Sequence, residues 1–92
     1  MGNFRKKPVE IQAYQFNGGD KNERFAFETW IDNYDGKTSN WFFDGEEYVS
    51  FCIVTLEGLM EVSKGDWVIR GVKNEFYPCK PDVFAAKYEQ IG

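Results

Sequence analysis

Histidine is absent from this 92-residue sequence, and its absence narrows the chemistry that the chain can support. Ser-His-Asp catalysis, Cys-His catalysis and histidine-ligated metal sites are excluded, as is the commonest general acid or base near neutral pH. An enzyme would have to use Asp, Glu, Lys, Tyr or Cys, and no pair of these residues has a spacing that indicates catalysis. We therefore expect a protein that is not an enzyme and that uses no cofactor.

The two cysteines, Cys52 and Cys79, are the remaining soft metal ligands and nucleophiles. Two thiolates cannot complete a four-ligand zinc site within one chain, and the pair lacks C-x-x-C spacing. Free cysteines are among the most often buried residues. We expect both to be reduced, buried thiols with no metal-binding or catalytic role.

Acidic residues outnumber basic residues by 15 to 11, which gives a formal net charge of −4. Binding of duplex DNA draws its affinity from clustered cations, so no duplex nucleic acid is expected as a partner. A small anionic ligand stays possible because it needs only a local basic pocket. Residues 38–63 contain no Lys or Arg and form an acidic block, which is either an ordinary solvated face or a surface for a basic partner. Its carboxylates belong to Asp44, Glu46, Glu47, Glu57 and Glu61.

The length predicts one globular domain over residues 1–92, with a core rich in rings because 18% of the residues are aromatic. No stretch approaches the roughly 18 consecutive apolar residues of a membrane helix. Residues 1–7 lack the apolar segment of a secretory signal. We therefore expect a cytoplasmic protein without a membrane partner.

The first third of the chain predicts a strand followed by a helix. Apolar and polar residues alternate over residues 8–16, which is typical of a strand, and Asn17-Gly18-Gly19 ends it. Asp20 followed by Glu23 has capping-box spacing and predicts the start of a helix of about 14 residues. Apolar side chains then recur at helical spacing and form one stripe that should face the core. They are Phe27, Trp30, Ile31 and Tyr34.

Between residues 41 and 78, segments rich in β-branched and aromatic residues are separated by turn signals, which predicts an antiparallel meander. Two-residue turns are expected at Glu57-Gly58 and at Lys73-Asn74. Pro81 fits the first position of a short C-terminal helix. The sequence thus predicts an α+β fold: a curled antiparallel sheet of five to six strands with one helix packed across it and a short C-terminal helix.

The predicted strand over residues 48–56 is apolar on both faces, with Phe51 and Ile53 on one side and Cys52 and Val54 on the other. Such a strand should be central and covered twice. The second cover is the terminal helix, the curl of the sheet or another subunit. Because surplus apolar surface on a small fold is often an interface, we expect a homo-oligomer, either a dimer or a tetramer.

The C-terminal half contains the runs Gly65-Asp66-Trp67-Val68-Ile69-Arg70-Gly71-Val72 and Glu75-Phe76-Tyr77-Pro78-Cys79-Lys80-Pro81-Asp82-Val83-Phe84, followed by Tyr88-Glu89. With the opening Arg5-Lys6-Lys7-Pro8-Val9 and the turn over residues 55–60, these runs resemble a family of small bacteriophage and prophage proteins. The family has a Gly-Asp-Tyr type motif, for which this chain has Gly65-Asp66-Trp67, and no settled activity. The resemblance implies a phage or prophage origin and supplies no mechanism.

The same motif places cations and aromatic rings on adjacent elements. Arg70 shares a strand face with apolar residues, and Lys80 lies next to a predicted helix N-terminus, where backbone N–H groups favour anions. Trp67 and Tyr77 should lie on neighbouring strands as stacking surfaces, and the basic N-terminal segment could fold back beside them. The predicted ligand-binding residues are therefore Arg70, Lys80, Trp67, Tyr77, Arg5 and Lys6.

These residues leave two functions open. The first is a phage-encoded, non-catalytic protein that sequesters a small anionic or nucleotide-like molecule, such as a host immune signalling nucleotide. The second is a protein–protein inhibitor or accessory factor whose acidic block meets a basic host protein. In the second case, Arg70 and Lys80 form structural ion pairs with nearby carboxylates such as Asp66, Glu75 or Asp82.

Overall fold

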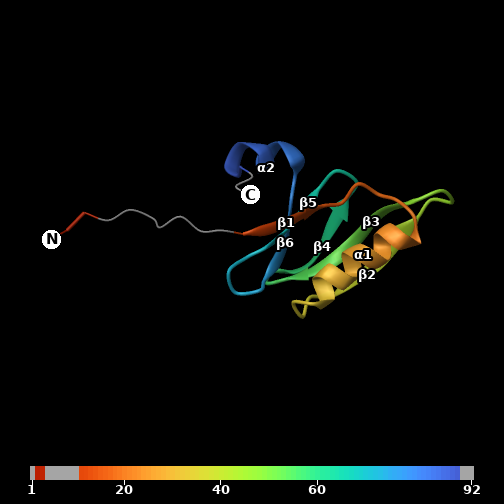
Figure 1. Ribbon diagram of the computed structural model, residues 1–92, viewed down its shortest axis with the longest axis horizontal. Helices are drawn as coiled ribbons and strands as arrows, with labels where there is room; N and C mark the ends of the chain where they lie inside the picture. The colour runs from red at the N-terminus through yellow and green to blue at the C-terminus, as the bar shows by residue number, and fades with distance from the viewer. Residues whose placement is uncertain (1, 4–10, 90–92) are drawn as a thin grey trace.

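The computed structural model describes residues 2–3 and 11–89 of the chain (Figure 1). The described residues form both strands and helices, so the predicted α+β class is confirmed. In chain order the elements are β1 (Gln12–Gln15), α1 (Lys21–Asp32), β2 (Thr38–Phe43), β3 (Tyr48–Thr55), β4 (Gly58–Ser63), β5 (Trp67–Arg70), β6 (Phe76–Cys79) and α2 (Pro81–Lys87).

The strands form two antiparallel three-stranded sheets, with strand orders β1-β5-β6 and β2-β3-β4. The expectation of one curled sheet of five to six strands is therefore wrong in this respect. The reason lies in the turn between β4 and β5, where Gly65 has a φ of 95°. The Gly65 N–H donates to the Phe16 carbonyl (2.6 Å), and the Phe16 N–H donates to the Asp66 carbonyl (2.8 Å). These bonds tie the turn to the end of β1, so β5 pairs with β1 instead of continuing the sheet beside β4.

Helix α1 begins where the sequence predicts. The Asp20 carboxylate accepts hydrogen bonds from the backbone N–H groups of Asn22 (2.9 Å) and Glu23 (3.2 Å), which satisfies two donors at the helix start. The helix has 12 residues, slightly fewer than expected. Its buried residues are Phe27 and Ile31, which belong to the predicted apolar stripe.

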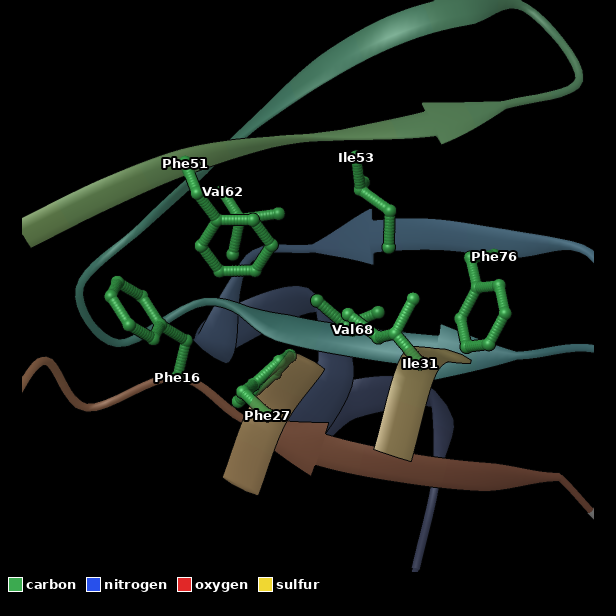
Figure 2. Close-up of a cluster of buried hydrophobic side chains, with 8 residues drawn as sticks. All are labelled: Phe16, Phe27, Ile31, Phe51, Ile53, Val62, Val68 and Phe76. Atoms are coloured by element: carbon green, nitrogen blue, oxygen red, sulfur yellow. The ribbon is translucent and has the colours of Figure 1, made fainter. Parts of the chain in front are cut away.

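The core lies where the inner faces of the two sheets and α1 meet (Figure 2). Both sheets, α1 and the segment after β1 contribute to it, so the sheets are held together by shared apolar side chains. Trp41 stacks on Phe51 with ring centroids 4.1 Å apart, and Phe27 meets Phe51 at 5.4 Å. The ring-rich core predicted from composition is confirmed. Its buried members are Phe16, Phe27, Ile31, Phe51, Ile53, Val62, Val68 and Phe76.

Helix α2 covers the other face of the β1-β5-β6 sheet. It begins at Pro81, as predicted, and its Phe84 ring stacks on Trp67 with centroids 4.1 Å apart and planes 7° apart. Trp30 of α1 packs against Phe76 on the opposite face, with centroids 5.6 Å apart. The β1-β5-β6 sheet thus has a helix on each side, whereas α1 contacts only the inner face of the β2-β3-β4 sheet.

Several local features differ from the sequence prediction. The connection between β5 and β6 spans Gly71–Glu75 and is not the expected two-residue turn at Lys73-Asn74, because Arg70 pairs with Phe76 and the Gly71 N–H donates to the Glu75 carbonyl (2.8 Å). The β3–β4 turn consists of Leu56 and Glu57, because Thr55 pairs with Gly58. Strand β2 begins at Thr38, three residues earlier than expected, because a register shift with Asn40 at a φ of 53° lets a polar segment join the sheet.

Candidate functional site

The predicted ligand-binding residues do not converge on one site. Trp67 and Arg70 are three residues apart on β5, so their side chains point to opposite faces of the sheet. Trp67 pairs with Cys79 and Ile69 pairs with Tyr77, which places Trp67 and Tyr77 on the same face of neighbouring strands. This arrangement separates the two predicted stacking surfaces from the Arg70 guanidinium. Arg5 and Lys6 lie outside the described residues.

The two predicted stacking rings are engaged by the C-terminal segment. Trp67 is stacked face to face on Phe84, so this face of the indole is covered by protein. Burial raises the pKa of Tyr77 to about 12, and hydrogen bonding to Tyr88 acts in the same direction. Both rings therefore help to hold α2 and the residues after it against the sheet.

Lys80 forms an ion pair with Asp66, the only buried polar or charged residue among those described (3% exposed). The Lys80 Nζ lies 3.2 and 3.1 Å from the two carboxylate oxygens of Asp66. Asp66 Oδ2 also accepts the backbone N–H of Ser63 at 2.9 Å. The Gly65-Asp66 pair thus closes the junction between the two sheets, and Lys80 is a partner in a structural ion pair at that junction.

Arg70 lies on the opposite face of the sheet, over the end of α1. Its Cζ is 3.7 Å from the centre of the Tyr34 ring. Its Nε donates to Gln12 Oε1 at 3.1 Å, and its Nη1 donates to Asn74 Oδ1. No described carboxylate lies within ion-pair distance of this guanidinium. It borders an open groove of about 350 Å³ that is also lined by Ile11, Gln12, Gly71 and Val72.

A second candidate surface is the outer face of the β2-β3-β4 sheet, the side turned away from the core. Pairing of Cys52 with Glu61 and of Val54 with Leu59 places these residues on that face. Phe42 pairs with Ser50 and lies on the same side. Phe42 is 58% exposed, Val54 46% and Leu59 58%. Strand β3 is therefore central and apolar on both faces, as predicted, but the described residues cover only one of the two.

The acidic block is divided among different parts of this sheet. Asp44 accepts the backbone N–H groups of Glu46 and Glu47 in the β2–β3 turn, and these bonds lower its pKa. Glu47 is ion-paired with Lys64. Glu61 lies on the outer face, and Glu57 lies in the β3–β4 turn at the other end of the sheet.

The cysteines are free thiols, but the expectation that both are buried is wrong. Each is half-buried. Cys52 lies on the outer face, where its sulfur accepts a weak hydrogen bond from Asn40 Nδ2 at 3.9 Å. Partial burial raises the pKa of the Cys79 thiol. Among residues 11–89 no cluster of three or more potential metal ligands occurs, and no helix in the part that the structure describes is long and apolar enough to span a membrane.

Comparison of the chain with protein-family models, with curated proteins and with solved structures finds no match. The resemblance to phage proteins therefore stays a prediction.

Sequence reasoning missed several residues of these surfaces. The sequence pattern places Tyr34 in the helix stripe and Gln12 among the polar strand residues, yet both contact Arg70. Phe42 and Leu59 carry no signal of exposure, since an apolar strand residue looks the same whether or not another element covers it. The odd spacing of Trp67 and Arg70, by contrast, already implies that they face opposite ways.

Proposed function

We propose that this chain is a non-catalytic binding module that docks a basic protein partner on the outer face of its β2-β3-β4 sheet. The observation that carries this proposal is the exposure of Phe42, Val54 and Leu59 on one side of a sheet whose other side forms the core. Large exposed apolar side chains that share one face of a small protein mark an interaction surface. Of the two functions considered from the sequence, this geometry favours the protein–protein inhibitor or accessory factor.

The extent of the surface sets the size of the partner segment. Strand β3 has eight residues, and eight strand residues span about 26 Å at roughly 3.3 Å per residue. Leu56, in the β3–β4 turn at one end of this sheet, is a further exposed apolar residue (87%). An amphipathic helix of about 18 residues covers a similar length, so an apolar helix face is one shape that fits.

The charges around this surface select the partner's chemistry. Glu46 and Glu57 lie in the turns at opposite ends of β3, and Glu61 lies on the face itself. None of the three forms an ion pair with a described residue. A partner with lysines or arginines around an apolar stripe would neutralise them, whereas a second copy of the chain would bring like charges together. The proposal therefore commits to a basic partner, and self-association is the competing occupant.

A synthetic peptide with the expected apolar and basic character can stand in for the partner. An 18-residue helical peptide with a leucine stripe and lysines elsewhere is titrated into the full chain by calorimetry, beside the same peptide with glutamate in place of lysine. We expect saturable binding of the lysine peptide only. Equal binding of both peptides, or of neither, would contradict the proposal.

Matched variants locate the binding. Phe42→Ala and Leu59→Ala should each lower the affinity for the lysine peptide by at least about tenfold, because each removes an apolar anchor of the interface. Phe25→Ala is the control, because Phe25 is 71% exposed but lies on α1. Equal weakening by Phe25→Ala would show unspecific adhesion.

The two thiols provide a second measurement. Cys52 lies at the centre of the outer face and Cys79 lies on the other sheet, so the bound peptide should slow alkylation of Cys52 and leave that of Cys79 unchanged. Light scattering of the free chain tests the competing occupant. A mass of twice 10.7 kDa that returns to the monomer value in Leu59→Lys would show that a second copy covers this face.

A further inference from the structure

We infer that Arg70, with Gln12, Tyr34 and Asn74 around it, forms a separate binding site for a small organic anion that carries a carboxylate or phosphate group. The site lies on the β1-β5-β6 sheet, away from the proposed docking surface. Of the six ligand-binding residues predicted from the sequence, this site contains only Arg70. Its other members are Gln12, Tyr34 and Asn74.

The Arg70 guanidinium is held in a fixed position. The Tyr34 ring lies beneath it at 3.7 Å, and the side-chain oxygens of Gln12 and Asn74 accept hydrogen bonds from two of its nitrogens. Stacking and neutral acceptors fix the plane of a guanidinium without cancelling its charge. The conformational entropy lost when an anion binds is therefore small, since the side chain is already ordered.

Donors remain available for a ligand. A guanidinium carries five N–H donors, and bonds to described residues use two of them. No described carboxylate is within 4.0 Å of it, in contrast to Lys80, Lys64 and Arg24, which each have one. The planar fork of arginine matches the paired oxygens of a carboxylate or phosphate.

The groove beside Arg70 has room for the uncharged part of a ligand whose anionic group binds the guanidinium. It measures about 350 Å³, which lies at the small end of the range for ligand pockets. Gln12 and the backbone of Gly71 lie beside apolar Ile11 and Val72. A compact ligand with one oxyanion and a small apolar body fits this lining. The stacking that a nucleobase would need is absent from the described lining, because Trp67 and Tyr77 lie on the other face of the sheet.

Nuclear magnetic resonance of the 15N-labelled full chain tests this inference. The probes are phenyl phosphate and benzoate as the two sources of an oxyanion, with benzyl alcohol as the neutral control. Saturable shifts of the Arg70 Nε–H and of the Gly71 and Val72 amides with either anion, and none with benzyl alcohol, would support the site. The anion that saturates at the lower concentration identifies the preferred group.

Two variants distinguish specific binding at the Arg70 guanidinium from a general electrostatic attraction of the anion to nearby positive charge. Arg70→Lys keeps the charge and loses the fork, and should weaken binding by at least about tenfold. Lys73→Gln removes a positive charge from the β5–β6 loop, which also contains Asn74, and should change the affinity for the anion less than about threefold. Equal losses in both variants, or shifts that never saturate, would overturn the inference.

If Arg70→Lys proves too unstable to measure, the wild-type Nε–H resonance decides, because a site that does not involve the guanidinium would leave it unmoved. The proposed docking surface is tested by Phe42→Ala and Leu59→Ala on the β2-β3-β4 sheet. Each proposal can therefore fail without the other.

Discussion

The junction between the two sheets makes the sharpest prediction about stability, because Asp66 and Lys80 contribute to it unequally. The Asp66 carboxylate is buried and accepts the Ser63 N–H at 2.9 Å, whereas the Lys80 side chain is 66% exposed. Asp66→Ala removes the acceptor and leaves the Ser63 N–H without its partner in a part-buried turn. Asp66→Asn keeps one oxygen for that N–H, and Lys80→Ala removes only the exposed half of the ion pair.

The expected magnitudes follow from burial. A hydrogen bond to a charged acceptor contributes about 1.5 to 3 kcal/mol, so Asp66→Ala should lower the free energy of unfolding by about 2 to 3 kcal/mol. An ion pair with one exposed partner contributes about 0 to 1 kcal/mol, which is the expected loss for Lys80→Ala. The loss of unfolding free energy in Asp66→Asn should lie between the losses in Lys80→Ala and Asp66→Ala. For a domain of this size, each 1 kcal/mol shifts the melting temperature by about 4 to 8 °C.

Urea denaturation followed by tryptophan fluorescence measures all three variants and the Asp66→Ala/Lys80→Ala double variant. The double variant should be no less stable than Asp66→Ala by more than about 0.5 kcal/mol, because the ion pair is already lost. A loss for Lys80→Ala as large as that for Asp66→Ala would refute the reasoning. It would mean that the ion pair, and not the Ser63 hydrogen bond, holds the junction.

Two further predictions concern packing and pH. Folding raises the pKa of Tyr77 from 10.0 to about 12, so the stabilisation from its neutral phenol is complete below about pH 10 and is lost as the pH rises toward 12. Denaturation measured over that range should show a steeper fall in the free energy of unfolding for the wild type than for Tyr77→Phe. Identical slopes for the two proteins would contradict this prediction. Gly36→Ala would place a Cβ 2.5 Å from Ile31 Cγ2 and 2.7 Å from Phe76 Cε2; we expect a loss of about 1 to 3 kcal/mol from overpacking, and an unchanged urea midpoint would show that the core can shift to accept a methyl group.

Local signals predict the elements well because they act within a few residues. Asp20 caps α1 by accepting hydrogen bonds from the backbone N–H groups of Asn22 and Glu23, two and three residues later, and Asn74 takes the positive φ (60°) expected for a turn. The two apolar faces of β3 are also visible in the sequence, since alternation along a strand needs only the strand itself.

Pairing of distant segments is not predictable in the same way. The division into two sheets depends on Phe16, which bonds to the turn at Gly65 and Asp66 across about fifty residues of sequence. Nothing local to either segment encodes that bond. The same limit applies to the candidate sites. Within the described residues the predicted anion site draws only on the segment from Trp67 to Lys80, whereas Arg70 contacts Gln12 and Tyr34 from the first half of the chain.

The irregularity in β2 makes this strand a poor template for the addition of a further strand. Strand β2 is an edge of its sheet, and a regular edge beside an exposed apolar face is a template on which further copies can add as strands. Between Ser39 and Phe42 the pairing shifts, and Asn40 takes a φ of 53°, so the row of free backbone groups along this edge is broken. The bulge therefore disfavours strand addition at this edge while leaving the outer apolar face of the same sheet accessible to a partner.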